Sequence, residues 1–240
     1  MRYAIYFALP AASELMQLGN RWLGRDPFAG ASLDQPVLPG MSADRFAALT
    51  TEPRRYGFHG TLRAPFSLKD GTVEDALIGA CKAFARQTAP FEIAGLKVDR
   101  LGSFLALVPM EQEPHLSAFA DLCIRAFEPF RAPLGDNDLA RRRKAPLTER
   151  QDAHLVQFGY PYIFEDFRFH MTLSNSLRDE DEATLLANAA RAHFDKVTGK
   201  ALSCSSFGLY VEAQRGAPFM VHSLFELTGG MAPAHAVAER

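Results

Sequence analysis

The feature that most constrains the fold of this chain is a short pattern that occurs twice. Residues 56–63 read YGFHGTLR and residues 167–174 read FRFHMTLS, so the order Phe-His-x-Thr-Leu is repeated. The segments after the two copies are also spaced alike, because Phe91 lies 32 residues after His59 and Leu202 lies 32 residues after His170. Matching order with matching spacing predicts an internal duplication, with repeat units at about residues 56–109 and 167–228.

Hydrophobic periodicity predicts the same series of elements in both units. Each unit is expected to run as a strand with the His-x-Thr-Leu motif, a helix, and two strands. The strands are expected at 56–65, 91–109 (broken near 99–102), 167–174, 205–214 and 219–229, the helices at 73–87 and 179–197. Outside the units we expect a strand at 2–10, a helix at 13–23, a helical turn at 42–49 capped by Ser42, and a helix at 113–130.

Composition indicates an ordinary soluble globular protein. The 240 residues are 48% hydrophobic and 22% charged, and the net charge is −2. We expect residues 1–230 to form one bilobal domain and 231–240 to be a disordered tail. The near-neutral charge argues against a partner that is long nucleic acid. The scattered Cys81, Cys123 and Cys204 are expected to be reduced thiols. No apolar run is long enough to span a membrane, and the N-terminus resembles a strand more than a signal peptide, so a cytoplasmic location is expected.

Alternation within the two motif strands places chemically active side chains on one face. Successive residues of a strand point to opposite sides. His59, Thr61 and Arg63 are therefore expected on one face of the first strand, and Arg168, His170, Thr172 and Ser174 on one face of the second. The alternate positions carry apolar residues and glycine. If the two units pack about a pseudo-twofold axis, the polar faces meet in one central site.

Two imidazoles and two hydroxyls around one centre suit attack at phosphorus. An unperturbed imidazole has a pKa of about 6.5, so one histidine can act as general base while its twin acts as general acid. Threonine hydroxyls donate hydrogen bonds to anionic oxygens. A cyclic phosphodiester fits best, because its leaving group stays tethered. The scheme requires neither a metal nor a cofactor.

The paired motifs resemble the two-histidine phosphoesterase superfamily, which includes 2′-5′ RNA ligase-like proteins and cyclic nucleotide phosphodiesterases. More narrowly, RYAIYFALP, RWLGRDP, RRYGFHGTL and GYPYIFEDFRFHMTL resemble a bacterial family associated with phosphonate-metabolism genes. The resemblance implies a bilobal α+β fold in which two antiparallel sheets line a cleft and helices lie outside. It implies catalytic roles for His59, Thr61, His170 and Thr172, and a small phosphorylated substrate such as a ribosyl cyclic phosphate.

Substrate-binding residues are expected beside the motifs. Arg63 lies on the polar face of the first motif strand, and Arg168 and Ser174 lie on the polar face of the second. Tyr6 lies on the strand expected at 2–10, and its aromatic ring is suited to a sugar or base. The basic run Arg141–Lys144 is read mainly as a solvated loop. Two alternatives stay open. One is an RNA-end enzyme, either a 2′,3′-cyclic phosphodiesterase or a 2′-5′ ligase-like enzyme that reversibly seals such ends, guided by that basic run. The other is a non-catalytic module that binds a phosphorylated metabolite.

Overall fold

The computed structural model describes residues 1–230 and has an α+β architecture built on one large antiparallel sheet. The strands are β1 (Arg2–Phe7), β2 (Arg25–Asp26), β3 (Ala31–Ser32), β4 (Gly60–Phe66), β5 (Phe91–Ile93), β6 (Leu96–Leu101), β7 (Phe104–Pro109), β8 (Met171–Thr172), β9 (Leu202–Cys204), β10 (Ser206–Glu212) and β11 (Met220–Glu226). The helices are α1 (Glu14–Leu23), α2 (Ala43–Leu49), α3 (Thr51–Tyr56), α4 (Glu74–Gln87), α5 (Pro114–Phe127), α6 (Asp136–Arg142), α7 (Glu149–Phe158) and α8 (Glu180–Phe194), with 3₁₀ turns η1 (Glu128–Phe130) and η2 (Phe164–Asp166). The predicted tail at 231–240 lies outside the described residues.

The two predicted units have the same order of elements. The first runs β4, α4, β5, β6, β7, and the second runs β8, α8, β9, β10, β11. The sheet order β11-β10-β1-β4-β8-β7-β6 shows that the units exchange their hairpins. The hairpin β10–β11 of the second unit joins the half of the sheet that contains β4, and β6–β7 of the first joins the half that contains β8. The crossover strands β5 and β9 pair with each other.

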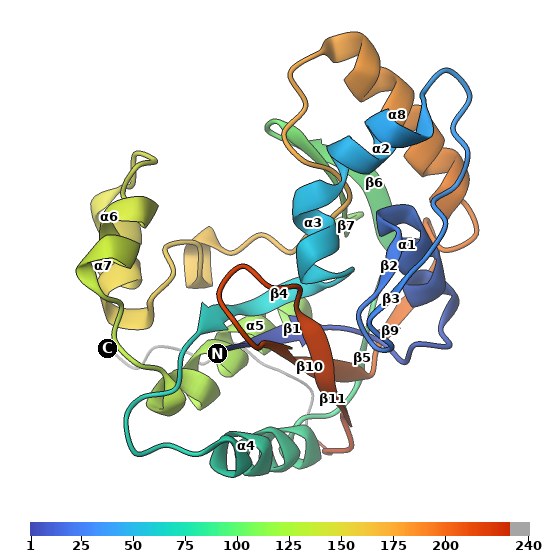
Figure 1. Cartoon of the computed structure of the whole chain (residues 1–240). Helices are drawn as coiled ribbons and strands as arrows, with labels where there is room; N and C mark the ends of the chain where they lie inside the picture. Colours follow the sequence, from blue (N-terminus) through green and yellow to red (C-terminus); the bar gives the residue numbers. More distant parts are fainter. Residues whose placement is uncertain (231–240) are drawn as a thin grey trace.

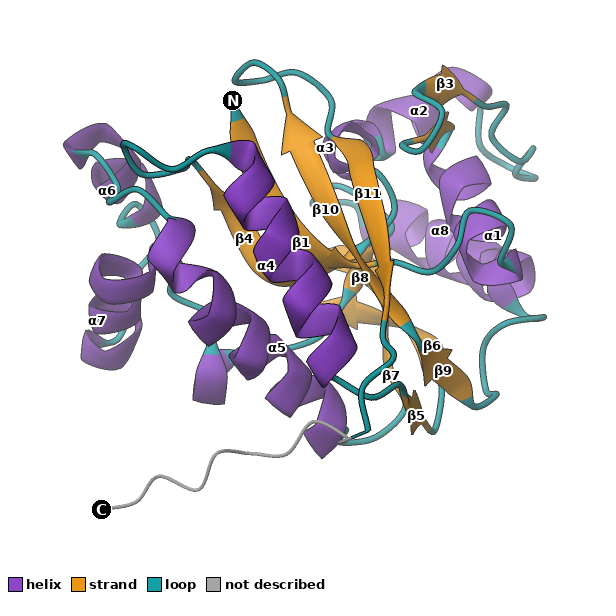
Figure 2. Cartoon of the chain, turned by 90° about the horizontal axis from the view of Figure 1, so that it is seen from below, coloured by secondary structure: helices purple, strands orange, loops and turns teal. Residues whose placement is uncertain are grey.

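Helices cover the two halves from outside (Figure 1). Helices α4 and α5 lie over the half formed by β1, β4, β10 and β11, and Figure 2 shows them side by side on one face of these strands. Helix α8 packs against β6 in the other half, with α1 and α2 beside it. Helices α6 and α7 form a separate group on the far side of β4 from α8. None of the helices in residues 1–230 has the length and apolar composition needed to cross a membrane.

The two halves of the sheet meet at the repeated motifs. Strands β4 and β8 pair antiparallel through Gly60 and Met171, the central residues of the two His-x-Thr motifs. The expected pair of sheets is thus joined into one along this line. The second motif has a further anchor, because the indole of Trp22, fully buried on α1, donates a hydrogen bond to the carbonyl of Leu173 at 2.9 Å.

Three sequence-based predictions of local structure need correction. The second motif strand is only Met171–Thr172, so residues 167–170 and 173–174 lie outside it. Residues 51–56, just before the first motif, form helix α3, and β4 begins at Gly60. The basic run at 141–144 is not a loop throughout, because its first two residues end helix α6 (Asp136–Arg142), whose acidic first turn and basic last turn complement the helix dipole. The helices at 13–23 and 42–49 and the hairpin at 205–229 are confirmed, with Ser13 and Ser42 as N-caps.

Candidate active site

The pairing of β4 with β8 brings the two motifs to one place. Antiparallel register through Gly60 and Met171 sets His59 opposite Thr172 and Thr61 opposite His170. The predicted alternation holds at every motif position: His59, Thr61, His170 and Thr172 are half-buried, whereas Phe58, Gly60, Leu62, Phe169, Met171 and Leu173 are buried. The four predicted catalytic side chains therefore lie on one face of the sheet, at the junction of its two halves.

Both imidazoles are held in the same way. The Nδ1–H of His59 donates to the carbonyl of Gly57 at 2.8 Å, and that of His170 donates to the carbonyl of Arg168 at 2.7 Å. Because a carbonyl oxygen can only accept, the proton must be on Nδ1 in each ring. This leaves each Nε2 as the basic atom when the ring is neutral. The Nε2 of His59 lies 3.1 Å from the hydroxyl oxygen of Thr61, which can donate to it.

Burial depresses the basicity of both histidines. It lowers the pKa of His59 to about 4, and protonated His170 nearby lowers it further, while the Gly57 carbonyl acts in the opposite direction. Burial also lowers the pKa of His170 below its ordinary value, again opposed by a backbone carbonyl. A neutral imidazole is the form that accepts a proton, so His59 in the free protein is suited to act as a base.

Tyr6 lies on β1, the expected N-terminal strand, next to His59. Its ring stacks on the imidazole of His59, with centroids 3.7 Å apart and planes at 21°, and its side chain is almost fully buried. Burial raises the pKa of Tyr6, so its hydroxyl stays protonated. Tyr6 lines the cavity next to His59, but the face of its ring is already occupied by the histidine.

Two of the predicted substrate-binding residues do not reach the site. Arg63 is 2% exposed and donates to the carbonyl of Ile124 and the carboxylate of Glu128, on the face covered by α5. The register explains this error, because Tyr6 pairs with Thr61 while Ile5 pairs with Arg63. The extra residue in β4 is a β-bulge, which reverses the alternation after Thr61.

Ser174 is the second such residue. It is 1% exposed, and its hydroxyl oxygen accepts from the amide of Leu105 and donates to the carbonyl of Asn175. Strand β8 ends at Thr172, so strand alternation does not extend to Ser174. Arg168, in contrast, is exposed and lines a cavity together with His170.

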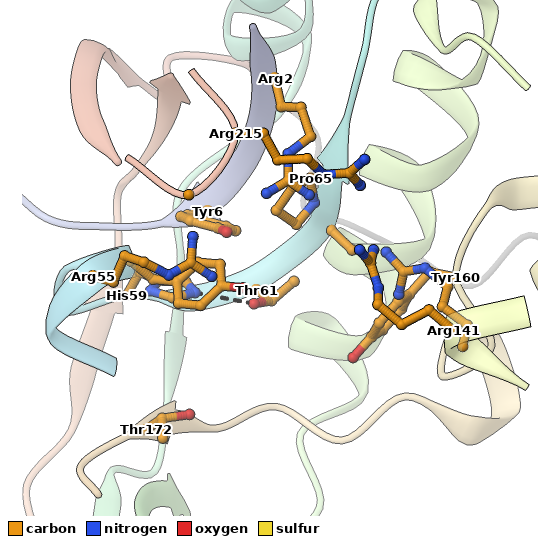
Figure 3. Close-up of a pocket in the computed structure, with 14 residues that line it drawn as sticks. Arg2, Tyr6, Arg55, His59, Thr61, Pro65, Arg141, Tyr160, Thr172 and Arg215 are labelled. Carbon is orange, nitrogen blue, oxygen red and sulfur yellow. Dashed lines mark hydrogen bonds between the residues drawn. The ribbon is translucent and has the colours of Figure 1, made fainter. Parts of the chain in front are cut away.

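Two adjoining cavities, each of about 570 Å³, open on this face of the sheet, in place of the single cleft expected. His59, Thr61 and Thr172 line the first, and Thr61 and His170 line the second. Thr61, Ala64 and Tyr160 belong to both linings and form the boundary between them. Figure 3 shows Tyr160 on the opposite side of the first cavity from His59, with Thr61 between them.

Arginines dominate the first cavity, and the sequence had connected only Arg141 and Arg142 with the site, through the alternative of an RNA-end enzyme. They come from four elements: Arg2 from β1, Arg55 from α3, Arg141 and Arg142 from α6, and Arg215 from the β10–β11 turn. Among the described residues, neither Asp nor Glu lines this cavity. The basic run at 141–144 was the one available signal, and its first two members do face the site. Within residues 1–230, no group of three or more His, Cys, Asp or Glu side chains is placed to hold a metal ion.

Comparison with known proteins gives two curated relatives, both named ribose 1,5-bisphosphate phosphokinase PhnN. The protein of Janthinobacterium sp. (strain Marseille) is 37% identical over 222 residues, and that of Laribacter hongkongensis (strain HLHK9) is 38% identical over 224. Each alignment covers 91% of this chain but only 49% and 50% of the relative, so the chain spans about half the length of the curated relatives it matches.

A solved structure, TT0787 of Thermus thermophilus, matches 96% of this chain and 100% of its own, at 15% identity and a TM-score of 0.48. A family model described as "Protein of unknown function (DUF1045)" matches residues 61–220, which contain most of both repeat units and both motif threonines. This match extends over more than half of the chain, and the curated relatives align with 91% of it. The chain therefore belongs to the DUF1045 family.

Proposed function

We propose that this protein is a phosphodiesterase that opens a small cyclic phosphate by acid–base catalysis with His59 and His170. The observation that carries the proposal is the common geometry of the two rings. Both are fixed through Nδ1 to a backbone carbonyl, and they lie at the junction where β4 pairs with β8. Such pairs of imidazoles supply a base and an acid to one reacting centre.

The proposed reaction begins with a water molecule near the Nε2 of His59. This nitrogen takes a proton from the water as its oxygen attacks phosphorus. The bond between phosphorus and one ring oxygen then breaks, and protonated His170 gives its Nε2 proton to the departing alkoxide. The product is a phosphate monoester with a free hydroxyl group. Thr61 and Thr172 are assigned hydrogen bonds to the phosphoryl oxygens. The two imidazoles handle both protons, so no metal is needed.

The substrate that we propose is a cyclic phosphate of ribose. The curated relatives are about twice as long as the matched region and are named as kinases of ribose 1,5-bisphosphate. Opening a 1,2-cyclic phosphate by cleavage at O2 leaves a phosphate on O1 of ribose, which is the kind of product such a kinase would use. The motif resemblance to two-histidine phosphoesterases and to a phosphonate-associated family supports the same substrate class.

A screen of cyclic phosphates by phosphorus NMR tests the proposal. The wild-type protein should hydrolyse a ribosyl 1,2-cyclic phosphate in EDTA, and His59→Ala and His170→Ala should each lose about 10²- to 10⁴-fold in rate. His115→Ala is the matched control, since His115 is exposed on α5 and lines neither cavity. Undiminished turnover in either motif variant would refute the assignment.

One observation favours action on RNA ends as a second candidate. Arg141 and Arg142 of the basic run line the cavity next to His59, where they could contact the phosphate preceding a 2′,3′-cyclic terminus. Contacts to several backbone phosphates make binding strongly salt-dependent. Faster hydrolysis of a short oligonucleotide with a cyclic end than of a ribosyl cyclic phosphate, with a steep salt dependence, would favour this candidate.

A further inference from the structure

The reacting phosphorus must lie where the two cavities meet. In the proposed reaction one imidazole takes a proton from water and the other protonates the leaving oxygen, so a single phosphorus atom has to be within reach of both rings. His59 lines only the first cavity, and His170 lines only the second. The residues that line both cavities are Thr61, Ala64 and Tyr160. These three residues are therefore the ones that lie next to the reacting group.

Tyr160 is the member of this set that offers an unassigned hydrogen-bond donor. Ala64 has no polar side-chain atom, and Thr61 is already assigned to a phosphoryl oxygen. The hydroxyl of Tyr160 makes no hydrogen bond within residues 1–230, although its side chain is half-buried. Figure 3 shows this hydroxyl directed into the first cavity, toward the side on which Thr61 and Thr172 lie. It is thus a free donor that faces the proposed reacting centre.

The local sequence and two neighbouring side chains fix the ring of Tyr160. Helix α7 ends before Gly159, which has a φ of 78° in the left-handed region. Pro161 disfavours a helical backbone at the residue that precedes it, so the helix does not resume at Tyr160. The guanidinium of Arg142 lies over the ring at 5.2 Å, and the ring of Tyr162 packs against it edge-on at 5.6 Å. These contacts hold the ring and leave its hydroxyl free.

The hydroxyl of Tyr160 acts as a donor and not as a base. Burial raises the pKa of Tyr160, although the charge of Arg142 acts in the opposite direction. The phenol therefore stays protonated at every pH at which one motif histidine is neutral and the other is protonated. A protonated hydroxyl stabilises an oxygen on which negative charge develops, and a donor that is fixed before the substrate binds does so without reorganisation.

We propose that Tyr160 is a further catalytic residue, whose hydroxyl donates a hydrogen bond to a non-bridging oxygen of the cyclic phosphate as water attacks. This inference rests on the proposed function. Tyr160 lies across the first cavity from His59, with Thr61 between them, so its hydroxyl approaches the phosphoryl group from a side that neither motif occupies. It adds a third donor to the two motif threonines.

Tyr160→Phe tests the hydroxyl alone, because phenylalanine keeps the ring and its contacts with Arg142 and Tyr162. The kcat for ribosyl 1,2-cyclic phosphate should fall by about 10²- to 10³-fold, as for the loss of one preorganised donor, with a smaller change in KM. Tyr162→Phe is the matched control and should keep the wild-type kcat, since Tyr162 is 41% exposed and lines only the second cavity. Equal kcat values for Tyr160→Phe and the wild type would overturn the proposal.

Phosphorothioate substrates separate a contact with the substrate from a structural role. In each diastereomer of ribosyl 1,2-cyclic phosphorothioate, sulfur replaces one of the two non-bridging oxygens and is a weak hydrogen-bond acceptor. In one diastereomer the replaced oxygen is the acceptor of the Tyr160 hydrogen bond. For that diastereomer the ratio of oxygen to sulfur rates should be smaller in Tyr160→Phe than in the wild type by about tenfold or more, because the variant has no such bond to lose. Unchanged ratios for both diastereomers would refute the contact.

Binding separates this proposal from the proposed function. If the wild-type protein hydrolyses no cyclic phosphate, the proposed function is refuted, and calorimetric titration with ribosyl 1,2-cyclic phosphate then tests Tyr160 without turnover. Binding about tenfold weaker in Tyr160→Phe than in Tyr162→Phe would keep the phosphoryl contact, and equal binding would refute it. Hydrolysis by the wild type with unchanged kinetics in Tyr160→Phe would refute the role of Tyr160 alone.

Discussion

The buried imidazole of His59 should make the protein sensitive to acid in a way that one substitution removes. Its ordinary pKa is about 6.5, and burial lowers it to about 4 in the folded protein. Between these two values the unfolded chain binds a proton that the folded protein does not. The free energy of unfolding therefore decreases as the pH falls through this window, and His59 contributes nothing to this decrease above about pH 7.

The shift sets the size of the effect. A difference of about 2.5 pKa units corresponds to about 3.4 kcal/mol when the pH is below both values. At pH 4.5 the linkage relation gives about 2.4 kcal/mol relative to pH 7. The ring of His59 is half-buried at a cavity, and water there screens part of its charge. We therefore expect His59 to account for between about 1 and 2.4 kcal/mol of the loss.

Urea unfolding of the wild-type protein and His59→Asn at pH 7 and pH 4.5 measures this contribution. Asparagine keeps a donor for the carbonyl of Gly57 but does not titrate. All other groups titrate in both proteins, so the difference between their two pH-dependent losses isolates His59. The variant should lose less stability on acidification by the amount given above. Equal losses in both proteins, or an NMR titration of His59 with a midpoint near 6.5, would refute the reasoning.

Three further predictions concern the motif and its surroundings. Because the pKa values of both His59 and His170 are lowered, the form with one neutral and one protonated ring is most abundant below pH 6.5. A bell-shaped kcat/KM profile should therefore have its optimum below pH 6.5, and an optimum above pH 7.5 would contradict the assignment. Gly60→Ala would place a Cβ 2.5 Å from the ring of Phe169, so it should cost about 1–3 kcal/mol in urea unfolding and also lower kcat; wild-type values for both would be inconsistent with this packing. Arg63→Leu should cost about 1–3 kcal/mol of stability, because a buried carbonyl loses its donor, while kcat/KM stays within about twofold of the wild-type value.

The motif face was predictable because strand alternation is a local rule. Each motif has its His and Thr two residues apart, so both side chains lie on the same face. The buried residue between them, Gly60 or Met171, shows that the opposite face packs into the core. The same rule failed for Arg63, where one extra residue in β4 changes the register with β1. A bulge depends on how β4 pairs with the neighbouring strand β1. The periodicity of the β4 sequence gives no information about that pairing.

The arginine cavity was not predictable for a different reason. Its arginines lie on four elements that are adjacent only in the folded chain, and alternation on one strand says nothing about a residue on another helix. Arg55 and Tyr56 illustrate this point, because both line the cavity from the end of α3, and only Tyr56 belongs to the strand expected at 56–65. Alternation along a strand at 56–65 would put Tyr56 on the face opposite His59, but this rule does not apply to a helix.

Segments outside the two predicted repeat units make the surroundings of the two motifs different. The motif histidines have matching hydrogen bonds and matching positions about the β4–β8 pair, so the chemistry of the two units is nearly the same. Many of the residues around His59 come from segments outside the two predicted units, above all β1, α3 and α6. These segments supply four of the five arginines of the cavity that contains His59, and β1 also supplies the ring of Tyr6 that stacks on His59.

The second cavity has a different charge balance. Arg100 and Arg168 line it together with Glu165 and Asp166, so its charges cancel, and the ring of Phe104 lies 5.6 Å from that of His170. An anionic substrate is attracted to the His59 side and not to the His170 side. Under the proposed function, the substrate therefore binds in one orientation, with its phosphate toward the arginines. This orientation is consistent with the roles proposed above, in which His59 removes the proton and His170 protonates the leaving group, although the two motifs are equivalent in sequence.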